Sequence, residues 1–385
     1  MENDTSPKSN IARGILWLVV IAVVLAGGYA VTKQKRSETI TFGAILPLTG
    51  SGADQAEWIR RGFDLALDEI NKDRKAPLTI AYEDSGGDTQ KAISAYRKLR
   101  TELHIPVVLT WGSGIGIALT PIVNEDKVVQ MGVATAANAY STPDDFTFRN
   151  FPQAEQEAVF LSDAVLRMLK SSEVAILKIN NDYGKSSADS FKEKFLAGGG
   201  KVIAEETFSP NDSDFRTQLT KLKKLSPKLI YLATYPKEGG LILRQAKELG
   251  ISTRFIASVA ILGGKDFFNL AGESAEGLIV ATSIPPLASS GKPNIQTFVQ
   301  HYRGKFGEEP SAQQIYTARA YDALNVLAGT LDTCGKEAEC IKEELFNIQN
   351  YNGVSGIFSF DHNGDVSAEF NLQVIKNGKF VTYQE

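Results

Sequence analysis

The sequence has few of the side chains that enzymes most often use to bind metals or to activate nucleophiles. Its 385 residues include only two cysteines and three histidines, and His104, His301 and His362 are scattered along the chain. A zinc site needs more ligands than this set can bring together, and a Ser-His-Asp triad needs a histidine base, which no strand end convincingly supplies. We therefore expect no metal site, no cofactor and no catalysis.

An excess of positive charge is also missing. The chain carries 41 Lys and Arg against 45 Asp and Glu, which gives a formal net charge of -4. Because proteins that hold a phosphate backbone neutralise it with basic side chains, nucleic acid is not an expected partner. The hydrophobic fraction of 43% is typical of a globular protein, and the length of 385 residues predicts two domains.

One long apolar run lies near the N-terminus. Residues 15–31 contain no charged side chain, and lysines and arginines stand on both sides of them. Such a segment is an export signal or a membrane anchor, and the basic cluster behind it favours the anchor. We assign residues 1–37 to this segment. The remainder is expected to work in the periplasm or on the outer face of the cytoplasmic membrane, with the segment as its contact with the membrane.

The two cysteines, Cys334 and Cys340, lie six positions apart in a charged stretch. In an oxidising compartment they can close a short loop, so export favours a disulfide over two free thiols.

From Thr39 onward, short runs rich in β-branched residues alternate with amphipathic stretches, a pattern typical of βαβ units and parallel sheets. The strands of a first doubly wound unit are predicted at 40–46, 78–83, 106–111 and 128–133. The pattern restarts after residue 152, with strands of a second unit predicted at 174–179, 202–207, 229–234, 255–259 and 278–282. The sequence therefore predicts the α/β class with two parallel-sheet lobes.

After residue 284 the sequence predicts three helical segments, at 294–306, 311–331 and around 340–348. The chain then ends in β structure. Segments 356–360 and 366–375 are expected to pair through a turn at Asn363-Gly364, and Asn377-Gly378 predicts a second tight turn.

The loop after the third predicted strand is the strongest candidate for a binding site. In open α/β sheets, ligands bind beyond the carboxyl ends of the strands. Trp111 and Gly112 lead there into Ser113, where glycine lets the backbone approach a ligand and a helix start offers free N–H groups. We interpret it as a cradle for an anion of carboxylate size, with the Ser113 hydroxyl as a donor and Trp111 as a wall. The alternative is a tight turn without a ligand.

Two known motifs are excluded at this loop. The spacing Gly-x-Gly-x-Gly differs from the dinucleotide fingerprint, and a nucleophile elbow would need glycine where Trp111 stands.

Other strand ends add candidate ligand contacts. Gln55 follows the first strand, and Ala134 and Thr135 follow the fourth. In the second unit Tyr183 and Tyr235 each follow a strand. We expect anion donors in one lobe to face a lid of tyrosines in the other.

At these residues the sequence resembles the leucine/isoleucine/valine-binding protein family, which are type I periplasmic binding proteins of ABC transporters. The resemblance extends from Thr39 to the end of the chain. It is strongest in GAILPLTG at 43–50, RRGFDLA at 60–66, LRQA at 243–246, AGESAEG at 271–277 and GVSGIF at 353–358.

This resemblance implies two lobes joined by a hinge of three crossing strands, with lobe 1 at 38–152 and 284–350 and lobe 2 at 153–283 and 351–385. It implies a non-catalytic protein that closes on a small polar solute and delivers it to the permease subunits of an ABC importer. A ligand-sensing receptor domain of the same fold is the alternative function.

The resemblance also implies roles for individual residues. Ser113 and the backbone near Ala134 would hold a substrate carboxylate, Tyr183 and Tyr235 would close over it, and Tyr316 would border the pocket. Three positions depart from the family pattern for α-amino acids: Val259 replaces the acid that receives the ammonium group, Ala136 replaces a threonine, and Gln55 replaces a tyrosine.

The loss of the acid at Val259 affects the expected ligand. An ammonium group without a buried acceptor would be costly to enclose. We therefore expect a small carboxylate or amide without a free α-ammonium group, unless Asp182 or Glu238 supplies the missing acid.

Overall fold

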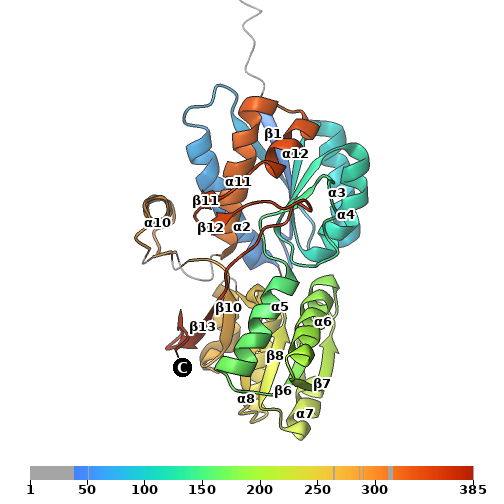
Figure 1. The fold of residues 1–385 in the computed structure, drawn as a ribbon, viewed down its shortest axis with the longest axis vertical. Coiled ribbons are helices and arrows are strands. Elements are labelled where there is room, and N and C mark those ends of the chain that lie inside the picture. The colour runs from blue at the N-terminus through green and yellow to red at the C-terminus, as the bar shows by residue number, and fades with distance from the viewer. Residues whose placement is uncertain are drawn as a thin grey trace, which may run out of the picture.

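The computed structural model describes residues 39–50, 52–262, 265–285, 287–288, 290–310 and 315–384. These residues form two lobes, drawn one above the other in Figure 1, each built on its own sheet. The predicted α/β class with two parallel-sheet lobes is confirmed. Residues 15–31, assigned above to a signal or anchor, lie outside the described residues. Within the described ranges, no helix combines the length and apolarity needed to cross a membrane.

Lobe 1 contains a five-stranded sheet in the order β2-β1-β3-β4-β5, with all neighbouring strands parallel. Its strands are β1 (Ile40–Leu46), β2 (Leu78–Asp84), β3 (Val107–Trp111), β4 (Val129–Ala134) and β5 (Thr147–Arg149). Its helices are α2 (Ala53–Ile70), α3 (Thr89–Leu103), α4 (Ser113–Asp126), α10 (Pro293–Phe306), α11 (Ile315–Cys334) and α12 (Ala338–Phe346). The strands of this sheet are largely buried because helices cover both faces, which explains their nearly continuous apolar sequences.

Lobe 2 contains a seven-stranded sheet in the order β14-β13-β10-β9-β8-β6-β7. Its strands are β6 (Glu173–Ile179), β7 (Lys201–Phe208), β8 (Leu229–Ala233), β9 (Arg254–Ala257), β10 (Ile279–Thr282), β13 (Asn371–Lys376) and β14 (Lys379–Thr382). Its helices are α5 (Ala154–Asp163), which continues as a π-helical turn (Ala164–Met168), α6 (Asp182–Ala197), α7 (Arg216–Leu225), α8 (Pro236–Glu248) and α9 (Lys265–Ala271). β13 and β14 add an antiparallel edge through the turn predicted at Asn377-Gly378.

The segment after α12 differs from the prediction. β11 (Tyr351–Gly353) and β12 (Gly356–Phe358) form their own hairpin, and the predicted pairing through Asn363-Gly364 is reduced to the single bridge between Phe360 and Val366. The hairpin belongs to lobe 1, because the Asp322 carboxylate of α11 accepts the N–H groups of Val354 and Ser355 at 2.9 and 2.7 Å. We therefore propose that lobe 2 resumes near residue 367 instead of at residue 351.

Two helices of lobe 1 pack so closely that one position between them must be glycine. A Cβ atom at Gly62 of α2 would lie 2.3 Å from the Thr317 carbonyl oxygen of α11. Because real Cβ atoms do not approach oxygen so closely, only glycine lets α11 return from the distant end of the chain onto α2.

Two buried arginines hold the three chain crossings between the lobes side by side. Arg149, at the first crossing, forms an ion pair with Asp365, at the third. Arg319 of α11 donates to the Ser283 carbonyl at 3.0 Å, at the second crossing, and its own carbonyl accepts from Asn150 at 2.9 Å. The hinge is therefore anchored to lobe 1 at all three strands.

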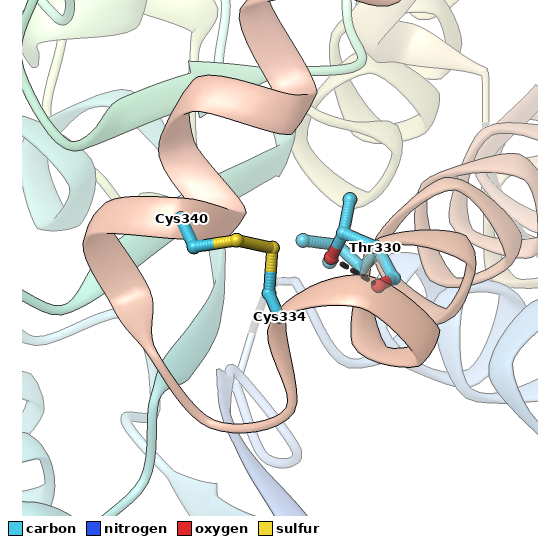
Figure 2. Close-up of a disulfide and its surroundings, with 4 residues drawn as sticks. Thr330, Cys334 and Cys340 are labelled. Carbon is cyan, nitrogen blue, oxygen red and sulfur yellow. Dashed lines mark hydrogen bonds between the residues drawn. A yellow bond between two sulfur atoms is a disulfide. The ribbon is translucent and has the colours of Figure 1, made fainter.

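Cys334 at the end of α11 and Cys340 in α12 form a disulfide, as the sequence predicts. Figure 2 shows the bond closing the short turn between the two helices, one helical turn after Thr330. The bond keeps α12 beside α11 at the end of lobe 1 that is far from the other lobe in Figure 1.

Reduction of this disulfide should destabilise the protein without changing its fold. A short closed loop removes enough entropy from the unfolded chain to contribute about 2 kcal/mol. Urea unfolding with and without a reductant measures the difference. The paired variant Cys334→Ser/Cys340→Ser should match the reduced protein and no longer respond to the reductant, and equal stability of oxidised and reduced protein would contradict the prediction.

Candidate functional site

A narrow cavity with a volume of about 10 Å³ lies between the lobes, at the carboxyl ends of their parallel strands. Both lobes line it, and nearly all of the lining residues are buried. The lining comprises Gln55, Ser113, Ala134, Ala136, Phe151, Tyr183, Tyr235, Ala260 and Tyr316. This volume is about that of one water molecule, so the lobes must open before a solute can enter.

Ser113 lies at the start of α4 because of the backbone turn before it. Gly112 has a φ of +89°, a conformation that a residue with a side chain rarely adopts, and its N–H donates to the Ala134 carbonyl at 3.2 Å. The turn places Ser113 as the first residue of the helix, where its Oγ accepts the Ala137 N–H at 3.1 Å. Its hydroxyl proton remains able to donate to a guest, beside the N–H groups of the helix start.

Gln55 connects the two lobes. Its Oε1 accepts the Trp111 indole N–H at 2.7 Å, and its Nε2 donates to the Ala260 carbonyl at 2.8 Å and the Tyr316 hydroxyl at 3.0 Å. An indole N–H can only donate and a carbonyl can only accept, so these partners fix the orientation of the amide. The bond to Ala260 crosses from α2 of lobe 1 to lobe 2 and therefore stabilises the closed arrangement.

Two tyrosines of lobe 2 form the opposite wall. The rings of Tyr183 and Tyr235 are stacked with their centroids 5.3 Å apart, and Tyr235 also contacts Trp111 of lobe 1 at 5.4 Å. Tyr183 is held by a hydrogen bond between its hydroxyl and Ser258. Burial raises the pKa of both phenols, so they stay protonated and can donate hydrogen bonds.

Four of the predicted contacts do not line the closed cavity. Trp111 lies behind Gln55 and Tyr235, and Gly112 serves the turn itself. Thr135 was expected to donate to an anion, but its side chain is wholly buried against Gly116 and Gly132. Val259 directs its N–H to a carboxylate of its own lobe. Local position at a strand end did not reveal which side chains turn inward.

The loop that carries Ala134 and Ala136 is positioned by Arg149. This guanidinium is fully buried and donates to the carbonyls of Thr135 and Ala137 at 3.3 and 2.8 Å. Its charge is balanced by Asp365. The binding loop and the hinge are therefore parts of one hydrogen-bonded unit.

Glu157 was not predicted as a site residue. It lies in the first turn of α5 and is only 2% exposed, and its carboxylate accepts the N–H of Val259. Burial raises the pKa of Glu157 to about 8. The local sequence does not predict the burial of Glu157, because Glu155, a glutamate in the same helical turn, is exposed.

The two acids proposed as substitutes at Val259 lie elsewhere. Asp182 is exposed and faces Gly114 across the gap between the lobes. Glu238 is wholly buried and accepts the Asn211 N–H at 3.1 Å. Neither contributes to the cavity lining.

Comparisons with known proteins agree with this architecture. The sequence model of a family described as periplasmic binding protein matches residues 39–379. The Leu/Ile/Val-binding protein homolog 3 of Brucella melitensis is 24% identical over 349 residues, which cover 89% of this chain and 93% of that protein.

Two solved structures have the same fold at similar identity. The leucine binding protein LivK of Thermotoga maritima has a TM-score of 0.84 and 26% identity, with 90% of this chain and 98% of that chain covered. The branched-chain amino acid transporter substrate binding protein LivJ of Streptococcus pneumoniae, in complex with isoleucine, has a TM-score of 0.82 and 26% identity, with 89% and 98% covered.

The variant Asp365→Ala should be strongly destabilised. Removing one partner of a buried ion pair leaves the Arg149 charge uncompensated, at a cost of about 3–5 kcal/mol. Chemical unfolding measures this loss. As a control, Glu369→Ala removes an exposed carboxylate nearby and should change stability by less than about 0.5 kcal/mol. Equal stability of the two variants would contradict the assigned role of the ion pair.

Stability should fall with rising pH because of Glu157, whose pKa is raised from 4.5 to about 8. Between these values the native state holds a proton that the unfolded state has lost, so each pH unit lowers the unfolding free energy by about 1.4 kcal/mol. The variant Glu157→Gln cannot ionise and should show a flatter profile, with equal stability near pH 4 and greater stability near pH 8. Unfolding curves across this range test the sign, and parallel profiles would show that Glu157 is not the group responsible.

Proposed function

The chain belongs to the leucine/isoleucine/valine-binding family of type I periplasmic binding proteins, and from this membership we propose that it binds one small polar solute between its lobes for an ABC importer. The observation that carries the proposal is the interlobe cavity with polar groups from both lobes in its wall. The family consists of substrate-binding proteins, and we propose a non-catalytic role here too.

The proposed mechanism is hinge closure. In the open form, Ser113, the start of α4 and the loop after β4 receive the solute on lobe 1. Rotation at the three crossings then brings Tyr183 and Tyr235 over it. The solute shifts the equilibrium by the contacts that it makes only in the closed form.

Neutral hydrogen bonds join the facing lobes, which suits repeated opening. Besides the Gln55 contact, the Asn138 N–H donates to Ser186 at 3.1 Å and its amide donates to Ser190 at 3.1 Å. The N–H groups of Ala154 and Glu155 donate to the Ala136 carbonyl at 2.8 Å and to the Asn138 amide oxygen at 3.3 Å. These are neutral hydrogen bonds, each contributing about 1 kcal/mol. A bound solute can therefore add a decisive share of the closing free energy.

We propose a solute of amino-acid size that carries a carboxylate or amide. The donors at Ser113 and at the start of α4 support this class. The proposed partners are the permease subunits of an ABC importer, which the chain would meet at the outer face of the cytoplasmic membrane. Residues 15–31 would export the chain or keep it at that membrane.

The proposal predicts that the purified protein carries or takes up a single small solute. Native mass spectrometry identifies the bound mass, and small-angle scattering should show compaction when that solute is returned to the emptied protein. No bound or accepted solute across a metabolite library, together with an unchanged scattering curve, would contradict the proposal.

The variant Ser113→Ala should bind the same solute about tenfold more weakly, since a lost hydrogen bond to a charged group costs about 1.5 kcal/mol or more. Isothermal titration calorimetry measures the change. The matched control is Ser171→Ala, which removes a buried hydroxyl that bonds the Glu173 carbonyl far from the cavity, and its affinity should equal that of the wild type.

A further inference from the structure

Glu157 lies immediately behind the lobe 2 wall of the cavity. Its carboxylate accepts the N–H of Val259, which stands between Ser258, the partner of the Tyr183 hydroxyl, and Ala260 of the cavity lining. Burial, and after it the charge of this carboxylate, raises the pKa of Tyr183 in the cavity wall and of Tyr231 in β8. Both causes also contribute to the raised pKa of Tyr316, which lines the cavity from lobe 1.

No positive charge in the described part of the protein balances Glu157. The influences on its ionisation are its burial and the single N–H of Val259. Buried carboxylates in proteins are normally paired with a cation or kept neutral by a proton. Glu157 therefore holds a proton in the empty closed form, unless a cation enters from outside the chain.

A purely structural role would not require an acid here. The observed contact is one backbone N–H donating to one carboxylate oxygen, and a glutamine amide oxygen could accept it equally well. Ionisation adds only the ability to attract positive charge. On the other side of the cavity, Ser113 and the start of α4 attract negative charge.

We propose that Glu157 sets the charge preference of the cavity. Its carboxylate favours a small solute that bears a cationic amino group as well as an anionic group over the same solute without the amino group. The inference rests on the proposed function, because it concerns the solute that the cavity encloses. It replaces the expectation, drawn from Val259, that the solute lacks an ammonium group.

Binding of a cationic solute should displace the proton of Glu157. Because the pKa of the empty form is about 8, nearly one proton should be released at pH 7. Affinity should then rise with pH between 6 and 8, by up to tenfold per pH unit. A residue that only supports the fold would not produce this linkage.

The test uses pairs of probes that differ by the amino group alone: L-leucine with 4-methylpentanoate, and L-valine with 3-methylbutanoate. Calorimetry in two buffers of different ionisation enthalpy gives affinity and proton release together. The wild type should prefer the amino acid of a pair at least tenfold and release close to one proton.

The variant Glu157→Gln should lose this preference at least tenfold and release no proton. The matched control is Glu238→Gln, which changes a second buried glutamate of lobe 2 that also accepts a backbone N–H but does not line the cavity. It should keep both the preference and the proton release.

Tighter binding of the des-amino probes, or an unchanged preference in Glu157→Gln, would overturn the inference and leave the proposed function standing. If neither probe series binds, the solute found by native mass spectrometry decides: a solute without a cationic group overturns the inference alone. The absence of any solute overturns the proposed function as well.

Discussion

The buried ion pair between Arg149 and Asp365 is the interaction on which the working parts of this protein depend. It joins the first and third chain crossings, and the same guanidinium holds the carbonyls of the loop after β4. Ser141 and Gln153 donate further hydrogen bonds to the Asp365 carboxylate. Because every charge in this cluster is satisfied, the hinge can be wholly buried without the desolvation penalty of an unpaired ion.

Neutral side chains in the cavity wall add to the positioning that the ion pair provides. Gln55 occupies a position between Trp111, Tyr316 and the Ala260 carbonyl, so that one amide fixes an aromatic wall and bridges the lobes. Stacked tyrosines add apolar area with protonated hydroxyls at their tips. Strong positioning within lobe 1 thus coexists with weak bonding between the lobes, a combination that permits closure around a guest and its later release.

The two buried acids Glu157 and Asp322 illustrate different solutions to burial. Asp322 accepts three hydrogen bonds from Val354 and Ser355, and its pKa is raised only to about 6. Glu157 accepts one, and its pKa is raised further, to about 8. The first acid anchors a hairpin within lobe 1. The second lies beside the cavity, and no cation among the described residues is paired with it.

The sequence by itself determined the α/β class, the strands β1 to β4 and β6 to β10 to within a few residues, and the loop where Ser113 meets the cavity. These features follow from local chemistry: β-branched runs, helix caps and the glycine turn at Gly112 are properties of neighbouring residues. Only the tertiary structure decided that the Thr135 side chain is buried, that the hairpin of β11 and β12 bonds to α11, and that Glu157 is buried while Glu155 is exposed. Each of these depends on which distant part of the chain packs against the residue, and the local sequence pattern does not determine that packing.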